Sequence, residues 1–238
     1  MAAGASSFFA SSDCAQWKRY LVNYKNVLEM FCIKKKKKNL LQLDNWYQTE
    51  LSSELKKRRD DSCLHKLELI KLMEWKLTRG KFRPRLTEMV KTNPDQMVED
   101  VSSSSFQKID RPEEAIKEMC KLKAVGPATA SAILTAYCPE IYAFMADEAV
   151  SSVISGKIDY TMKYYLTFLD KITKKAKELS KKDTNTWTPH DVELALWTHK
   201  ISCQLDIELT EEKEKGKATK RKSNDTDVKA KKKSKTDK

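Results

Sequence analysis

The sequence predicts a mainly α-helical protein, and three observations support this prediction. Apolar residues recur three and four positions apart through most of the chain. Helix-start signals precede several of these segments. Alternation typical of a strand is found at most over residues 141–145. We expect a flexible start over residues 1–13, one helical domain over 14–208 and a disordered Lys-rich tail over 209–238.

The first half of the domain is expected to form three helices. The first spans residues 15–31, the second 40–55 and the third 65–77, and each has an apolar face. The run 34–38 consists of lysines and is expected to be a solvated helix end, with phosphate contact as the alternative. The expected inward-facing residues are Trp17, Tyr20, Leu21, Tyr24, Val27, Leu28, Phe31, Leu43, Trp46, Tyr47, Leu51, Leu67, Ile70, Met73 and Leu77.

The remaining helices are bounded by proline and capping residues. Short helices are expected over 84–92 and 94–101, divided at Asn93-Pro94, and a long one over 160–179. A last helix begins at Thr188, which serves as the cap for Pro189 in the first position, and continues through Ile201.

Residues 112–136 are expected to form two helices joined by a tight turn. Asp110 and Glu113 have the spacing of a capping box around Pro112, and the chain restarts helically after Gly126-Pro127. Such a turn directs the free amides of the second helix's N-terminus outward, where they suit a phosphate. The alternative is that the Ala-rich second helix simply provides a packing face.

This stretch resembles the helix-hairpin-helix of DNA-binding proteins, Leu-x-Gly-Val-Gly-x-x-Thr-Ala-x-x-Ile/Leu. The matching residues are Leu122, Val125, Gly126, Thr129, Ala130, Ile133 and Leu134. Ala124 stands where the pattern has its first glycine. The following segment, 139–149, is similar to the aspartate loop of the endonuclease III superfamily of base-excision DNA glycosylases. The resemblance is good over 116–149 and loose over 65–200.

The resemblance implies a catalytic aspartate at Asp147. It also implies DNA contacts through the hairpin, at Lys123, Val125, Gly126, Ala128 and Thr129. Bifunctional members carry a lysine where this chain has Ala128, so any catalysis is expected to be monofunctional removal of a damaged or mispaired base. The alternative for Asp147 is an ordinary helix N-cap. The helices before the hairpin are shorter than in the family. The alternative is therefore that the chain has kept the DNA-binding hairpin and lost the catalytic chemistry.

A basic loop follows the helix that ends near Leu77. Its cations alternate with Gly80, Phe82 and Pro84, a pattern that suits a phosphate backbone and an unstacked base. Trp75 is a candidate base-pocket residue, with a place in the core as the alternative. Lys76 falls near the position of the family's gap-filling Gln. The expected DNA-contacting residues here are Lys76, Arg79, Lys81, Arg83 and Arg85, with a solvated helix end as the alternative.

The net charge of +12 favours a polyanionic partner, and residues 211–238 supply half of it. The clusters 220–222 and 229–235 indicate nuclear import, although a Lys-rich end also serves solubility alone. The six cysteines show no Cys-x-x-Cys pair, which argues for reduced thiols and against an iron–sulfur cluster. Because the sequence has only three histidines, we expect no metal site, and we expect no cofactor. No apolar run is long enough for a membrane span.

Three functions therefore stay open. They are a monomeric glycosylase acting on duplex DNA, a non-catalytic binder of intact or abasic duplex, and a nuclear module that binds another protein.

Overall fold

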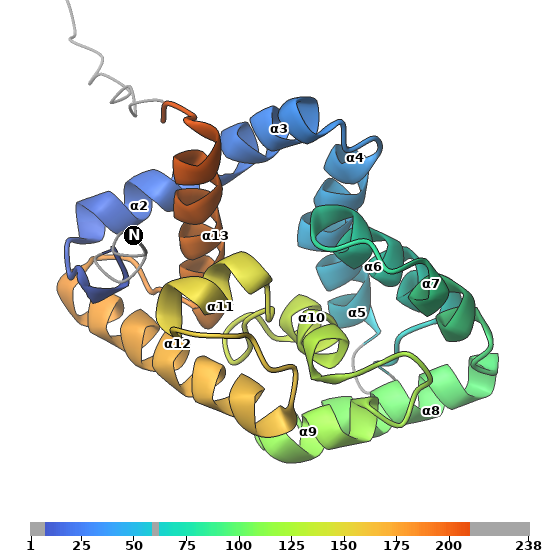
Figure 1. Ribbon diagram of the computed structural model, residues 1–238. Coiled ribbons are helices and arrows are strands. Elements are labelled where there is room, and N and C mark those ends of the chain that lie inside the picture. Colours follow the sequence, from blue (N-terminus) through green and yellow to red (C-terminus); the bar gives the residue numbers. More distant parts are fainter. Residues whose placement is uncertain (1–7, 59–61, 210–238) are drawn as a thin grey trace, which may run out of the picture.

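The computed structural model describes residues 8–58 and 62–209, and this part of the chain is helical throughout without strands (Figure 1). The predicted fold class is therefore confirmed, and residues 141–145 are not a strand. Nearly all of the Lys-rich tail, including both import-like clusters, lies outside the described residues. Within the described ranges, no helix combines the length and apolar character needed to cross a membrane.

The N-terminal half contains α2 (Cys14–Val22), α3 (Tyr24–Lys35), α4 (Leu40–Asn45), the π-helical turn η1 (Trp46–Leu51), α5 (Ser52–Lys57), α6 (Lys66–Arg79) and α7 (Pro84–Lys91). The C-terminal half contains α8 (Asp95–Phe106), α9 (Pro112–Met119), α10 (Pro127–Tyr137), α11 (Asp147–Val153), α12 (Met162–Lys182) and α13 (Pro189–Leu205).

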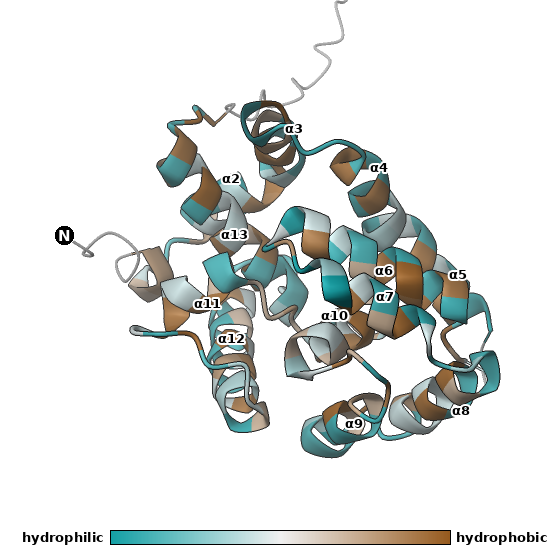
Figure 2. Cartoon of the chain, turned by 45° about the vertical axis from the view of Figure 1, so that its right-hand side comes forward, coloured by the Kyte–Doolittle hydropathy of each residue, from teal (hydrophilic) through white to brown (hydrophobic). Residues whose placement is uncertain are grey.

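Helix α10 lies at the centre of the molecule and is buried on all sides from Ala128 to Ala136. Helix α13 contacts α2, α3, α11 and α12, so the last helix joins the start of the chain to its second half (Figure 1). Apolar and hydrophilic residues alternate around the outer helices α8 and α12, as expected for helices that bury one side (Figure 2).

Two of the predicted helices are organised differently. The helix expected over 15–31 is divided at Asn23, whose side-chain amide donates to the Arg19 carbonyl at 2.9 Å. The helix expected over 40–55 is one helical run, but it contains the π-helical turn at its centre. The lysine run ends α3 at Lys36, which has a left-handed backbone, and Lys37 reaches the Gly80 carbonyl at 3.4 Å.

The buried face of α6 differs from the predicted stripe. Leu67 is 79% exposed, whereas Leu69, Leu72 and Trp75 are buried. The reason is that α6 packs against α4, α7, α8 and α10 together, so its inward side is wider than one stripe and turned away from Leu67.

Part of the segment expected to be flexible packs on the domain. Phe8 is buried, with its ring centroid 4.3 Å from that of Trp17 and 4.4 Å from that of His199. The Ser12 hydroxyl donates to the carboxylate of Glu178 on α12. Residues 8–13 therefore belong to the folded domain.

The two predicted caps have different outcomes. Thr188 forms a capping box with Asp191 at the start of α13, as predicted. The predicted capping box of Asp110 and Glu113 is wrong, because the N-cap of α9 is Arg111 and no side chain caps that helix. Arg111 instead pairs with Glu114 at 3.0 Å.

Candidate nucleic-acid interface

The turn between α9 and α10, residues 120–126, is held from the side by Asn93. The Lys123 amide donates to Asn93 Oδ1 at 2.8 Å, and Asn93 Nδ2 donates to the Lys123 carbonyl at 3.1 Å. Asn93 is buried between α7 and α8. The sequence indicated only a helix boundary there, and an amide clamp between distant segments has no local signal.

Ala124 occupies a left-handed backbone conformation in this turn, with φ of 65°. Glycine adopts this region freely, whereas a residue with a Cβ is strained by about 1–2 kcal/mol. The position at which the sequence departs from the helix-hairpin-helix pattern is thus one where the backbone favours glycine.

The N-terminus of α10 presents unpaired amides. Gly126 has an extended backbone, and no atom lies within 4 Å of the position that a Cβ would occupy. Among the described residues, no hydrogen bond engages the amides of Gly126 and Ala128. The side chains of Val125, Ala128 and Thr129 are buried, so any contact with an anion would come from the backbone.

A pocket of about 260 Å³ opens beside this helix start. It brings together three separate parts of the sequence that were predicted to be functional: the end of α6 with the basic loop, the turn before α10, and the segment that leads into α11. Asp147, Lys76, Lys81 and Arg83 all line it, whereas Arg85 and Lys123 are exposed outside it.

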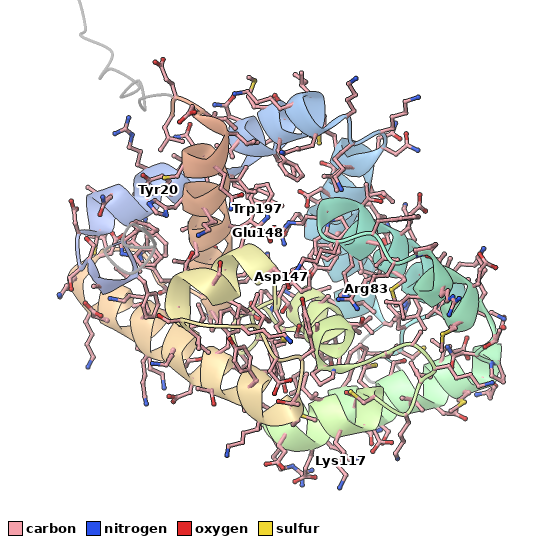
Figure 3. All side chains as sticks on the ribbon, viewed as in Figure 1. Tyr20, Arg83, Lys117, Asp147, Glu148 and Trp197 are labelled. Atoms are coloured by element: carbon pink, nitrogen blue, oxygen red, sulfur yellow. The ribbon has the colours of Figure 1, made fainter. Side chains whose placement is uncertain are left out.

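Asp147 is the first residue of α11 and its carboxylate is held from two sides. The Tyr160 hydroxyl donates to both carboxylate oxygens, at 2.7 and 2.9 Å, and Lys81 Nζ lies 2.9 Å away. The N-cap of α11 is Ala146, so Asp147 is not the cap. Figure 3 shows Asp147 and Glu148 at the start of α11, on the same side of the molecule as Arg83.

Tyr160 is a pocket residue that sequence reasoning missed. The guanidinium of Arg83 lies 5.6 Å from the centroid of its ring. Burial, together with the hydrogen bond to Asp147, raises the pKa of Tyr160, so its hydroxyl stays a donor. Burial also raises the pKa of the neighbouring Glu148 carboxyl. The only sequence signal for Tyr160 was its place near a helix start.

The basic loop beside the pocket carries an exposed aromatic ring. Lys81 and Arg83 are exposed, and Phe82 between them is 74% exposed. A phenyl ring in solvent between two cations has the composition that stacks on a base beside a phosphate backbone. This part of the predicted loop is therefore accessible to solvent.

Arg79 was predicted to contact DNA, but the structure buries its side chain. Its side chain is 2% exposed, and both of its terminal nitrogens lie 3.2 Å from Glu193 Oε1. The guanidinium also lies 4.7 Å from the ring centroid of Trp197. Arg79 borders the pocket, but its guanidinium is held in a buried ion pair between α6 and α13.

Trp75 was predicted as a base-pocket residue, but the structure places it elsewhere. It is fully buried, stacks on Tyr47 with ring centroids 3.6 Å apart, and does not line the pocket. Its indole N–H donates to Asp44 at 2.9 Å, and the Tyr24 hydroxyl donates to the same oxygen at 2.8 Å. Trp75 therefore belongs to the core.

Lys76 differs from the other predicted cations. Its side chain is half-buried in the pocket wall, and among the described residues it has no hydrogen bond and no ion pair. Burial, with the nearby charge of Arg83 adding to it, lowers the pKa of Lys76 to about 8. The pocket thus contains an amine whose protonated form is disfavoured by burial.

No family model, curated protein or solved structure matches this chain. Within residues 8–58 and 62–209, no cluster of three or more His, Cys, Asp and Glu side chains is arranged to hold a metal ion.

Proposed function

We propose that this protein binds duplex DNA with the turn before α10 against a phosphate, and that the pocket receives a nucleotide turned out of the duplex. The observation that carries this proposal is the single pocket shared by the start of α10, the basic loop and Asp147. A base must leave the stack before a protein can act on its glycosidic bond, and a pocket next to a phosphate site suits that geometry. The basic tail is proposed to direct the protein to the nucleus.

The chemistry we propose is monofunctional removal of a damaged or mispaired base. As the bond from C1′ to the base breaks, its electron pair leaves with the base and the sugar becomes positively charged. The Asp147 carboxylate, oriented by Tyr160 and Lys81, stabilises that charge and activates the water that replaces the base.

We expect Asp147→Asn to abolish base release while leaving DNA affinity unchanged within about twofold. An amide carries no charge to oppose that of the sugar, and a lost catalytic carboxylate typically costs about 10²–10⁴-fold in rate. The measurement is single-turnover release of the base from duplexes that contain a panel of lesions and mismatches. If the wild-type protein binds these duplexes but releases no base from any of them, the alternative of a non-catalytic DNA-binding protein holds.

Gly126→Asp is expected to weaken DNA binding about tenfold and to reduce the salt dependence of the affinity by about one phosphate contact. The space around the Gly126 Cβ position is open, so the new carboxylate would stand where the phosphate binds without disturbing the fold. Gly126→Asn is the matched control, because it adds the same volume without the charge. Equal affinities of the two variants across a salt titration would place the phosphate elsewhere.

A further inference from the structure

Lys76 is placed as a reactive amine rather than as a phosphate contact. It lies in the last turn of α6, and its half-buried side chain lines the same pocket as Asp147 and Ala128. Arg83 and the exposed Lys81 stand nearer the rim, where a phosphate would meet them first. A cation in the pocket wall, away from solvent, is poorly placed to contact the phosphates of a DNA backbone.

Among the charges that act on Lys76, that of Asp147 favours its protonated form. Asp147 is already engaged by Lys81 at 2.9 Å and by Tyr160. Glu148 is itself favoured in its neutral form by burial. Burial and the positive charge of Arg83 lower the pKa of Lys76 by more than the charge of Asp147 raises it.

This environment makes Lys76 a nucleophile near neutral pH. With its pKa lowered to about 8, Lys76 carries the neutral amine at pH 7 far more often than an ordinary lysine does. The pKa of Lys81 is shifted in the opposite direction, because the ion pair with Asp147 raises it and keeps Lys81 protonated.

We propose that Lys76 is a catalytic residue that forms an imine with the aldehyde of an abasic-site sugar held in this pocket. The proposal rests on the proposed function, because it requires that the pocket receives a sugar of a DNA strand. It departs from the expectation that Ala128 leaves the chain without an amine for this chemistry. The amine comes from another helix and reaches the same pocket.

The step balances without any further reactant. The neutral Nζ of Lys76 attacks C1′ of the ring-opened sugar, and the π electrons of the carbonyl move to its oxygen to give a carbinolamine. The oxygen then takes up protons and leaves as water, which gives a protonated imine between Nζ and C1′. Hydrolysis reverses the sequence and returns both the lysine and the aldehyde.

The test is borohydride trapping of the full-length protein on a duplex with a single abasic site. Borohydride delivers hydride to the imine carbon and leaves a stable secondary amine, whose position is mapped by mass spectrometry. Lys76→Arg keeps the positive charge but removes the nucleophile, so the trapped yield should fall at least about tenfold. Lys71→Arg, an exposed substitution five residues earlier on α6, should leave it unchanged.

The affinity of each variant for the same abasic duplex is measured in parallel, and the fold is checked by circular dichroism. An adduct at Lys76 that is lost in Lys76→Arg, with affinity kept within about twofold, supports the inference. Equal trapping by Lys76→Arg, or an adduct mapped to another lysine, overturns it. Binding of the abasic duplex without trapping overturns this inference alone, whereas absence of binding overturns the proposed function as well.

A second measurement, made without DNA, follows the titration of the Lys76 amine itself. Reductive methylation with ¹³C-formaldehyde labels lysines, and the NMR signal that disappears in Lys76→Arg reports the titration of Lys76. We expect it to titrate near pH 8. Titration at the ordinary value of about 10.4 would overturn the inference whatever the DNA result is.

Discussion

Arg79→Met is expected to lower the free energy of unfolding by about 3–5 kcal/mol, because it leaves Glu193 buried without its partner. Glu193 is fully buried on α13, and its second oxygen already has no hydrogen bond among the described residues. Burial raises the pKa of Glu193 to about 7 even with Arg79 beside it. Without Arg79 both oxygens of this carboxyl would lack a hydrogen bond, because His190 Nδ1, 3.7 Å from Oε2, lies beyond hydrogen-bond distance.

The measurement is chemical denaturation at pH 7, and a loss of this size would lower the melting temperature by about 10 °C in a domain of this length. Arg83→Met, which removes an exposed cation of the same segment, should change the stability by less than about 0.5 kcal/mol. The pair of variants separates the two roles, since we expect Arg83→Met to weaken DNA binding. A stable Arg79→Met protein with weakened DNA affinity would return Arg79 to the DNA-contacting surface.

Trp75→Ala is expected to destabilise the fold by about 3–5 kcal/mol through the cavity that it leaves in the core. The indole fills the space between Tyr47, on which it stacks, and Phe144, whose ring centroid is 5.2 Å away. Its removal also takes one donor from Asp44, whose carboxyl is buried.

Trp75→Phe divides this effect into its two parts. The phenyl ring keeps the stacking on Tyr47, while the loss of the N–H to Asp44 should cost about 1–3 kcal/mol. Both variants are compared with the wild type by denaturation and by DNA affinity at a temperature where they are folded. If Trp75→Ala keeps its stability but loses affinity for lesion-bearing DNA, Trp75 lines a base pocket after all.

Much of the helical framework could be predicted from the sequence because helix formation is local. The Thr188-Pro189 start of α13 and the division at Asn93-Pro94 depend on residues within one turn of each other, and both agree with the structure. The division of 15–31 at Asn23 and the register of α6 could not be predicted in this way. Both depend on which neighbouring helices pack against the segment.

The candidate site was likewise predictable from the sequence only in part. The residues of the basic loop, the turn and Asp147 were identified from short patterns, and the structure brings them to one pocket. The patterns could not distinguish Arg79 from Arg83, since both are arginines of the same short basic stretch. Glu193, which decides the role of Arg79, comes from α13, more than a hundred positions later.

The sequence by itself therefore determined most of the helices, the Thr188 cap and the uneven distribution of positive charge, all of which follow from residues close together in the chain. Only the tertiary structure decided which polar groups are buried, which of them are paired and which face the pocket. Burial and pairing depend on contacts between distant segments, as for Asn93 with the turn, Tyr160 with Asp147, and the unpaired Lys76. Removal from water changes the proton affinity of a side chain, so the proton affinities of the groups in this pocket are set only once the helices are packed.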